Sequence, residues 1–252
     1  MYLTGDGGGK FVSFCCDVRM SSSAAAADGG FDIRLRPGFT LLMVAPSTGG
    51  KTYYCYRLLM EINELAVSPV TRLGIFFKVH QPIYDRMRQD LPFPVELFNE
   101  LPTEEVVRPR AEREQESGGS YCLVVDDFGA AGVNQYMVDY ARVHSHHYNS
   151  PLICLVQTLF AKSPLYREFT LNMRYYVVFP NPRDKSGFLY LARQLSPSHW
   201  RAVVGIFEAI TSVPFNPMWI DMTQECPPEL RYRSHMLRSD IPRGVQVWVP
   251  NK

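Results

Sequence analysis

Short apolar runs bounded by turn-forming residues recur along the chain, and runs of this kind predict buried β-strands. They lie at Phe39–Val44, Arg72–Val79, Tyr121–Asp127, Pro151–Gln157, Arg174–Phe179 and Pro217–Met222. Helical patterns occupy most of the intervals, at Tyr53–Leu65, Pro82–Gln89, Thr103–Glu116, Gln135–His147, Phe160–Phe169 and Trp200–Thr211. Strands that alternate with helices predict an α/β fold, with a mostly parallel central sheet flanked by helices.

The two ends of the chain depart from this pattern. Met1–Gly30 is rich in Gly, Ala and Ser, which predicts a flexible arm with one strand at Lys10–Cys16. Residues 31–237 carry the alternating pattern and are expected to form the main domain. Residues 238–252 are expected to form a C-terminal tail, with an edge strand at Val245–Val249.

Composition limits the class of protein. Apolar residues make up 46% and charged residues 20% of the 252 residues, so the chain can bury a sizeable core and is not globally disordered. The net charge of +1 excludes a protein that coats nucleic acid through a general basic excess, so any such contact must be local. The six cysteines form no C-x-x-C pair and are too dispersed for a zinc site. Cys55, Cys122 and Cys154 lie in apolar elements and are expected to be small core residues, which fits a reducing compartment. We find no secretory signal and no apolar stretch of the about 20 residues that a membrane-spanning helix needs.

A phosphate-binding loop is predicted directly after the first apolar run. The segment reads Ala45, Pro46, Ser47, Thr48, Gly49, Gly50, Lys51 and Thr52, and it follows a strand and precedes a helix, as the motif requires. Gly49 and Gly50 allow the backbone N–H groups to surround phosphate oxygens. Lys51 would reach the β- and γ-phosphates of ATP, and the Thr52 hydroxyl would bind Mg²⁺. The alternative is a chance Gly-Gly-Lys-Thr turn.

The first position of the loop is unusual, because Ala45 stands where the motif has glycine. If this position required a positive φ, alanine there would be strained. Pro46 supplies no N–H group, but its fixed φ would stiffen the entrance to the loop.

Polar side chains follow two further apolar runs. Asp126 and Asp127 end the run that begins at Tyr121, where an acid is expected to hold the water molecules of Mg²⁺. Asp127 is the candidate for polarising the attacking water, a role more often taken by glutamate. Gln157 ends the next run and is the candidate for sensing the γ-phosphate or orienting water. The alternative for each is an ordinary polar residue at the end of a strand.

Taken in order, several segments resemble viral genome-packaging ATPases of the FtsK–HerA superfamily. The resemblance is strongest to those of polinton-like and adintovirus-type double-stranded DNA viruses, and more distant to the poxvirus type. The segments are APSTGGKT, YCLVVDDF, HSHHYNSPLICLVQTLF, REFTLNMRYYVVFPNPRD, and WIDM before ELRYRS. They span about Phe31 to Leu237, and Ala45 and the Gly/Ala-rich arm depart from the pattern.

The resemblance implies a RecA-like P-loop NTPase core that works as a homo-oligomeric ring. ATP with Mg²⁺ would sit between subunits, and double-stranded DNA would be driven into a preformed capsid. Capsid or portal-vertex proteins are then partners, and the protein would act in the host cell, in the nucleus or cytoplasm, and in the virion, without being secreted.

The resemblance also implies residue roles. Lys51, Thr52, Asp126, Asp127 and Gln157 carry over onto the family's catalytic and metal positions. An arginine from the neighbouring subunit should complete the site. The candidates are Arg142, Arg174 and Arg183. The loops that grip DNA phosphates would be Lys78–Arg88 or Arg183–Lys185.

Other classes of function remain open from sequence. A P-loop nucleoside or nucleotide kinase would need an arginine-rich lid, for which Arg108–Arg113 is the candidate. A non-hydrolysing nucleotide-binding scaffold would explain Ala45 as the mark of a decayed loop. A replicative helicase with a similar core is a close relative of the packaging motor.

Overall fold

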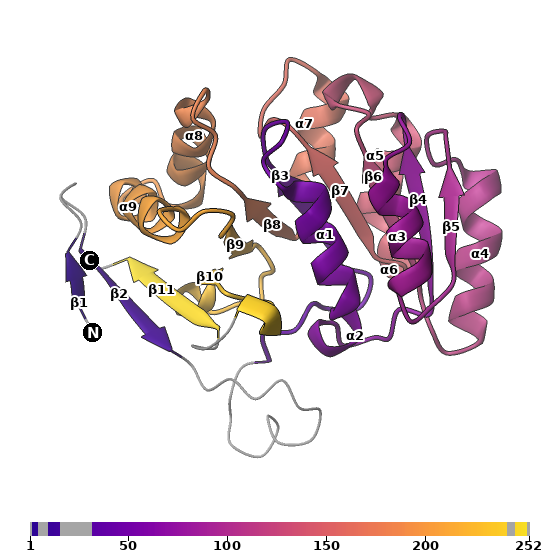
Figure 1. Cartoon of the computed structure of the whole chain (residues 1–252). Helices are drawn as coiled ribbons and strands as arrows, with labels where there is room; N and C mark the ends of the chain where they lie inside the picture. Colours follow the sequence, from indigo (N-terminus) through magenta and orange to yellow (C-terminus); the bar gives the residue numbers. More distant parts are fainter. Residues whose placement is uncertain (1, 5–9, 16–31, 241–244, 251–252) are drawn as a thin grey trace. The chain divides into compact units, whose positions relative to one another are not determined.

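The computed structural model describes residues 2–4, 10–15, 32–240 and 245–250. Two compact units contain them (Figure 1). The parallel unit comprises residues 34–44 and 50–174, and the antiparallel unit comprises the other described residues. The flexible arm predicted at Met1–Gly30 lies largely outside the described residues. The main domain predicted over residues 31–237 spans both units.

All five strands of the parallel unit run in the same direction, and they form one sheet. In order across the sheet they are β3 (Thr40–Val44), β7 (Leu152–Val156), β6 (Tyr121–Asp126), β4 (Arg72–Phe77) and β5 (Val95–Phe98). Every residue of β3, β6 and β7 is buried. Continuous apolar runs are typical of parallel strands, because helices cover both faces of such a sheet.

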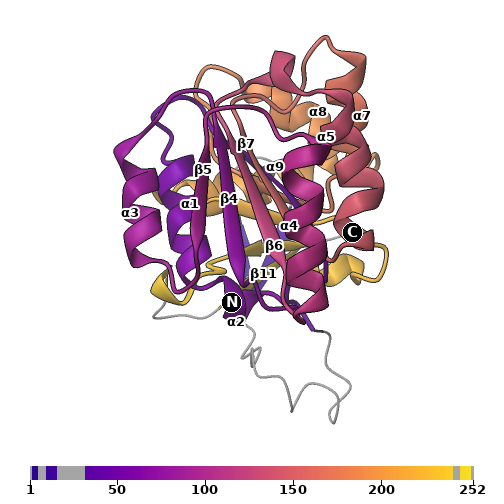
Figure 2. The same cartoon turned by 90° about the vertical axis from the view of Figure 1, so that its right-hand side faces the viewer.

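Helices cover both faces of the parallel sheet (Figure 2). On one face lie α1 (Lys51–Met60) and α3 (Pro82–Asp90). On the other lie α4 (Glu104–Glu116), α5 (Gln135–Asp139) and α7 (Pro164–Leu171). The shorter helices of this unit are α2 (Ile62–Leu65), η1 (Ala130–Gly132), the π-helix η2 (Tyr140–His144) and α6 (Ser145–His147).

The register of the parallel sheet sets which strand ends meet. Val44 of β3 lies beside Val156 of β7, and Asp126 of β6 lies beside Leu155 of β7. The carboxyl ends of these three strands therefore meet at one edge of the sheet. In open α/β sheets this edge is where ligands bind.

The antiparallel unit contains six of the described strands, and each of them is hydrogen-bonded to the next. In order they are β8 (Tyr175–Val178), β9 (Met218–Asp221), β10 (Tyr232–Ser234), β11 (Gln246–Pro250), β2 (Lys10–Cys15) and β1 (Tyr2–Thr4). Each neighbouring pair is antiparallel. The expected strand at Lys10–Cys16 is present as β2. The edge strand expected at Val245–Val249 is present as β11, but it is not an edge, because β10 and β2 pair with its two sides.

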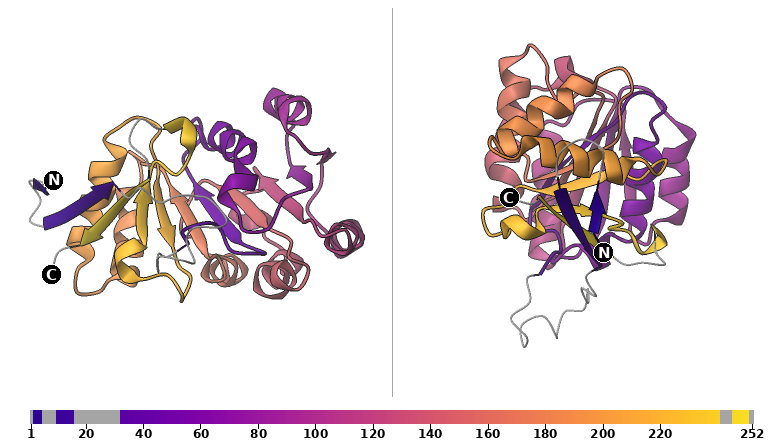
Figure 3. Two further views of the ribbon diagram at one scale, coloured as in Figure 1. Left: turned by 90° about the horizontal axis from the view of Figure 1, so that it is seen from below. Right: turned by 90° about the vertical axis from the view of Figure 1, so that its left-hand side faces the viewer.

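Two long helices of the antiparallel unit lie beside each other (Figure 3). They are α8 (Lys185–Leu195) and α9 (Trp200–Thr211), and the shorter 3₁₀ helices are η3 (Pro228–Leu230) and η4 (Arg238–Asp240). The rings of Phe188 and Phe207 stack with centroids 3.8 Å apart and join α8 to α9. Along the described chain, no helix is both long and apolar enough to cross a membrane.

The predicted fold class is confirmed as α/β, with a parallel sheet that is flanked by helices on both faces. The helix at Trp200–Thr211 has the predicted bounds, and the predicted helix at Tyr53–Leu65 is divided into α1 and α2. The predicted helix at Phe160–Phe169 begins later, at Pro164, because proline suits the first turn of a helix and not its interior. Sequence patterns missed the strands β1, β5 and β10.

Candidate nucleotide site

The loop before α1 has the backbone that a phosphate-binding loop needs. The Gly49 N–H group donates to the Pro46 carbonyl at 2.9 Å, which closes a tight turn. A Cβ atom at Gly49 would lie 2.9 Å from that same carbonyl oxygen, so only glycine fits without a shift. Gly50 has a φ of 84° and is the N-cap of α1. Both glycines are therefore required by the local geometry.

Ala45 is not strained. Among the described non-glycine residues, positive φ values occur at Thr48, Asp127, Asn149, Phe215 and His235, and not at Ala45. The left-handed conformation in this loop falls on Thr48 (φ 64°) and on Gly50. Ala45 itself is buried, with 1% of its surface exposed. The substitution at the first position of the motif thus carries no backbone penalty.

The start of α1 lies next to the acid at the end of β6. Lys51 and Thr52 occupy the first turn of α1, and Lys51 is 9% exposed. The Thr52 hydroxyl donates to Oδ2 of Asp126 at 3.1 Å. This hydrogen bond joins two segments that are 74 residues apart in the sequence. The structure therefore brings together the residues that were predicted to bind the metal.

Asp126 is held by a second hydroxyl, that of Tyr84 in α3. The Tyr84 hydroxyl donates to the same Oδ2 atom at 2.9 Å. Burial raises the pKa of Asp126, whereas the hydrogen bonds from Tyr84 and Thr52 and the charge of Lys51 act in the opposite direction. The net pKa of Asp126 is above its usual value. Burial and the neighbouring Asp126 likewise raise the pKa of Tyr84, so its hydroxyl remains a donor at neutral pH.

Sequence reasoning missed Tyr84. Its ring is fully buried, and it stacks on Phe77 of β4 with ring centroids 5.0 Å apart. His80 contacts both rings edge-on. The predicted helix at Pro82–Gln89 included Tyr84, but no motif relates a tyrosine in this helix to the acid on β6. Only the fold shows that the two side chains meet.

The structure places the other two strand-end candidates at the same edge of the sheet. Asp127 directly follows β6, is partly exposed, and has a φ of 66°. A positive φ is uncommon for residues other than glycine, although aspartate tolerates it, and it turns the chain sharply at the strand end. Gln157 directly follows β7, is exposed, and stands two positions beyond the register partner of Asp126. Neither residue belongs to the hydrogen-bonded group of Thr52, Tyr84 and Asp126.

The three candidate arginines lie in different surroundings. Arg142 in η2 forms ion pairs with Asp139 at 2.7 Å and with Glu168 at 3.3 Å. Arg174 precedes β8, and its positive charge helps burial to lower the pKa of His146. Arg183 is exposed in the loop before α8, in the antiparallel unit.

The arginines expected to form a kinase lid belong to a regular helix. Arg108 forms i,i+4 ion pairs with Glu104 and Glu112 along α4. Arg110 pairs with Glu96 of β5 at 3.0 Å. These side chains tie α4 to itself and to the edge strand, so this segment does not provide the lid that a kinase would need.

The oxygen atoms at the end of β6 suit a magnesium ion with its water molecules. Mg²⁺ prefers hard oxygen ligands and usually takes only one or two from the protein. The Thr52 hydroxyl and the Asp126 carboxylate, 3.1 Å apart, supply such oxygens. Lys51 in the same turn as Thr52 supplies a positive charge for a phosphate group. The residues present therefore fit a nucleotide with its metal ion.

Comparison with known proteins gives weak likenesses only. No protein-family model and no curated protein matches the chain. Among solved structures, the genome packaging NTPase B204 from Sulfolobus turreted icosahedral virus 2, in complex with ATP-gammaS, is 10% identical, with a TM-score of 0.47. The match covers 75% of this chain and 95% of that one.

Two longer proteins give similar values. EssC (ATPases 2 and 3) from Geobacillus thermodenitrificans is 12% identical with a TM-score of 0.44, and the match covers 84% of this chain and 39% of that one. The cytoplasmic domain of the type VII secretion ATPase EccC from Thermomonospora curvata is 13% identical, also with a TM-score of 0.44. This match covers 81% of the present chain and 28% of the EccC chain. At these values the activities of the neighbours do not transfer to this chain.

Proposed function

We propose that this chain is a P-loop ATPase that couples ATP hydrolysis to the translocation of double-stranded DNA. The main support for ATPase activity is that Lys51, Thr52 and Asp126 lie close together at the carboxyl edge of a parallel sheet. The 3.1 Å hydrogen bond from Thr52 to Asp126 supports this assignment, because both residues are expected on one metal ion. Few other functions place a buried acid beside the lysine and threonine that follow a glycine-rich turn.

In this proposal the first turn of α1 binds the triphosphate. The Lys51 ammonium group holds the β- and γ-phosphate oxygens, and backbone N–H groups at the start of α1 point toward them. Thr52 and Asp126 would hold Mg²⁺, and the Tyr84 hydroxyl keeps the Asp126 carboxylate in place for this role. The ion would supply positive charge for the phosphate groups.

Asp127 and Gln157 are the proposed groups for the attacking water. Asp127 would accept its proton, and Gln157 would orient it or sense the γ-phosphate. An arginine of a neighbouring subunit would stabilise the transition state. Arg183 is the first of the three candidates to test, because it has no carboxylate partner among the described residues, whereas Arg142 is held by Asp139 and Glu168.

The coupling to DNA, the ring and the packaging role rest on the resemblance to viral packaging ATPases. On this proposal a homo-oligomeric ring binds ATP between subunits and drives DNA into a capsid with the help of capsid or portal-vertex proteins. Contacts would be made to phosphates, so DNA binding would be independent of sequence and sensitive to salt.

The first prediction tests the ATPase and its coupling to DNA. Purified protein should hydrolyse ATP, and duplex DNA should raise the rate. Lys51→Ala should abolish hydrolysis because it removes the charge that binds the phosphates, whereas Lys162→Ala, at an exposed lysine of the same unit, should leave the basal rate unchanged. The measurement is phosphate release with and without duplexes of several lengths, alongside the mass of the protein in solution.

Each alternative function gives a different result in this assay. Hydrolysis that ignores DNA of every length would contradict translocation and leave an ATPase. Binding of nucleotide without turnover would instead indicate a scaffold. Transfer of phosphate to a nucleoside in place of water would indicate a kinase.

A further inference from the structure

The junction between α8 and α9 carries an unusual group of side chains. Trp200 is the first residue of α9, and the guanidinium groups of two arginines lie over its indole ring. The guanidinium carbon of Arg193, in the last turn of α8, lies 4.7 Å from the ring centroid. That of Arg201, the next residue after Trp200, lies 4.5 Å from it. We call these three residues the Arg–Trp–Arg surface.

The two arginines of this surface are exposed and have no carboxylate partner among the described residues. Three other exposed arginines, Arg86, Arg108 and Arg142, form ion pairs with acids on their own or a neighbouring helix. Arg193 and Arg201 differ from these three, and also from isolated arginines such as Arg183 that have no carboxylate partner in the described chain, because both lie over one aromatic ring. The charge at the Arg–Trp–Arg surface is therefore not neutralised within the described protein.

Stability of α9 does not explain Arg201. The first turn of α9 contains no acidic residue. A cation at the N-terminal end of a helix is unfavourable, because the helix dipole is positive there. Stacking on Trp200 compensates in part through a cation–π interaction. The arrangement thus concentrates positive charge on an exposed and ordered surface.

Stacking also sets the direction in which the guanidinium groups can bind. When an arginine lies flat on an aromatic ring, the face of its guanidinium group contacts the ring. The N–H groups at the edge of the guanidinium group remain available as hydrogen-bond donors. Those N–H groups match the oxygen atoms of a phosphate and can donate to two of them at once. Held in this way, each arginine loses less conformational freedom when it binds than a free side chain would.

We propose that the Arg–Trp–Arg surface binds the phosphate backbone of double-stranded DNA. The choice of DNA over other polyanions rests on the proposed function of the chain. A net charge of +1 gives no general attraction to DNA, so the contact must come from a local group of unpaired cations such as this one. It adds a contact outside Lys78–Arg88 and Arg183–Lys185, the two loops expected from sequence.

The second prediction tests this surface by comparing two double variants of equal charge. Arg193→Gln with Arg201→Gln removes both stacked cations. Arg108→Gln with Arg110→Gln removes two ion-paired cations of α4, outside both loops expected to grip DNA. Binding to a labelled duplex is measured by fluorescence anisotropy between about 50 and 200 mM salt. The first variant should bind more weakly, and the slope of log K against log salt should fall in magnitude by about 2, because two phosphate contacts are lost.

A third variant separates charge from positioning. Trp200→Leu removes the stacking platform but keeps both arginines, so it should weaken binding and leave the salt slope close to that of the wild-type protein. Circular dichroism of each variant confirms that the fold is retained. This result would show that Trp200 positions the two arginines for binding, and that their charge alone is not sufficient.

Several outcomes would overturn the proposal. Equal loss of affinity in the two double variants would show that only net charge matters, and unchanged affinity in the first would show that this surface is not used. Preference for anionic lipid vesicles over DNA would reassign it to a membrane. Basal ATP hydrolysis is measured in parallel: its presence without DNA binding would reject this surface and leave the ATPase, and its absence in the wild-type protein would reject the ATPase itself.

Discussion

At the scale of single residues, the central atom of the candidate site is Oδ2 of Asp126. It accepts hydrogen bonds from both Thr52 and Tyr84, and Asp126 is almost completely buried. Burial favours the neutral form of this acid, whereas the hydrogen bonds from the two hydroxyl groups favour the carboxylate. The two hydroxyl groups also fix the direction of the Asp126 side chain before any nucleotide binds.

The third prediction concerns Tyr84→Phe, which removes one hydroxyl and keeps the ring packed on Phe77. Loss of a hydrogen bond to a charged group is worth about 1.5 kcal/mol, so kcat/KM for ATP should fall about tenfold. In the wild-type protein the hydrogen bond from Tyr84 lowers the pKa of Asp126. Without this bond, the pKa of Asp126 should rise further above its usual value. The acid limb of the pH–rate profile should therefore move to higher pH.

The matched control is Tyr56→Phe. The Tyr56 hydroxyl of α1 donates to Asp90 of α3 at 2.7 Å, so this change removes the same kind of tyrosine–aspartate bond and also frees one contact of α3, but it leaves Asp126 untouched. Its effect on ATP turnover should be small, because Asp90 is not at the strand ends. Equal effects of the two substitutions would mean that Tyr84 acts only through the packing of α3.

At the level of elements, α4 is fixed to the sheet by a buried acid. Glu114 accepts from the Thr71 hydroxyl at 2.6 Å and from Arg72 Nε at 2.7 Å. Burial raises the pKa of Glu114, but these hydrogen bonds and the charge of Arg72 outweigh it, and the pKa lies below the usual value. The contact joins the C-terminal half of α4 to the start of β4.

The fourth prediction follows from the sign of this shift. A lowered pKa means that Glu114 stabilises the fold above the pKa of the unfolded chain, about 4.3, and loses this effect as the pH falls through the folded value. Glu114→Gln should therefore lower the free energy of unfolding by about 1–3 kcal/mol at pH 7. The difference from the wild-type protein should shrink as the pH falls to 4 and below.

Urea unfolding between neutral pH and about pH 3 measures this difference, since the loss occurs at and below the lowered pKa of Glu114. Glu112→Gln is the control, since Glu112 lies on the same helix but forms only an exposed pair with Arg108. Its effect should stay below about 1 kcal/mol at every pH. A difference for Glu114→Gln that does not depend on pH would refute the ionic contribution.

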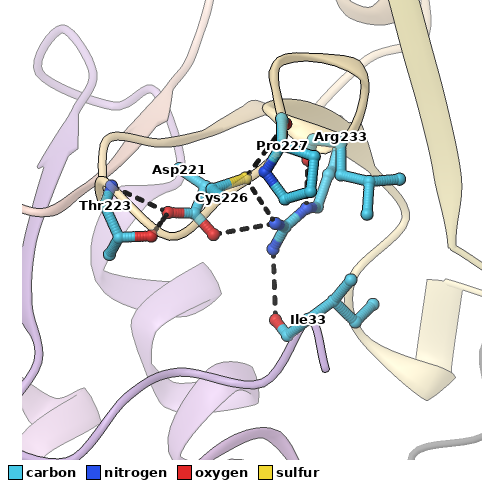
Figure 4. A network of polar contacts seen from close by, with 7 residues as sticks. Ile33, Asp221, Thr223, Cys226, Pro227 and Arg233 are labelled. Carbon is cyan, nitrogen blue, oxygen red and sulfur yellow. Dashed lines mark hydrogen bonds and ion pairs between the residues drawn. The ribbon is translucent and has the colours of Figure 1, made fainter. Parts of the chain in front are cut away.

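At the level of the whole molecule, the antiparallel unit is organised around a buried ion pair (Figure 4). Arg233 of β10 donates to Asp221 of β9 at 2.7 Å, and both side chains are less than 5% exposed. Arg233 also donates to the carbonyl groups of Leu230 and Ile33. The second oxygen of Asp221 accepts from the backbone and hydroxyl of Thr223. The pair thus connects two strands, the turn between them, and a residue 200 positions earlier.

The fifth prediction is that Arg233→Met will destabilise this unit. It leaves Asp221 buried without its cation, which costs about 3–5 kcal/mol. The three tryptophans of the chain, Trp200, Trp219 and Trp248, all lie in the antiparallel unit, so their fluorescence during denaturation reports this unit alone. Arg86→Met, at an exposed pair, should leave the midpoint close to that of the wild-type protein. A fluorescence midpoint for Arg233→Met that matches this control would contradict the assigned role of the pair.

The sequence by itself determined the features that depend on neighbours along the chain. The apolar runs identified the central parallel strands, and the glycine-rich turn with Lys51 and Thr52 marked the start of α1. The two aspartates at the end of β6 were found by the same kind of local pattern. Each of these signals is short, because strand burial, turn geometry and helix initiation are set within a few residues.

Only the tertiary structure decided which distant segments meet. Residues Gln246–Pro250 pair with residues 11–15, so the strand that was expected at an edge is enclosed on both sides. The contact of Tyr84 with Asp126 and the burial of Arg233 against Asp221 depend on chain closure in the same way. The physical reason is that pairing and desolvation are properties of the assembled sheet, and the pattern within a single strand or helix does not specify its partner.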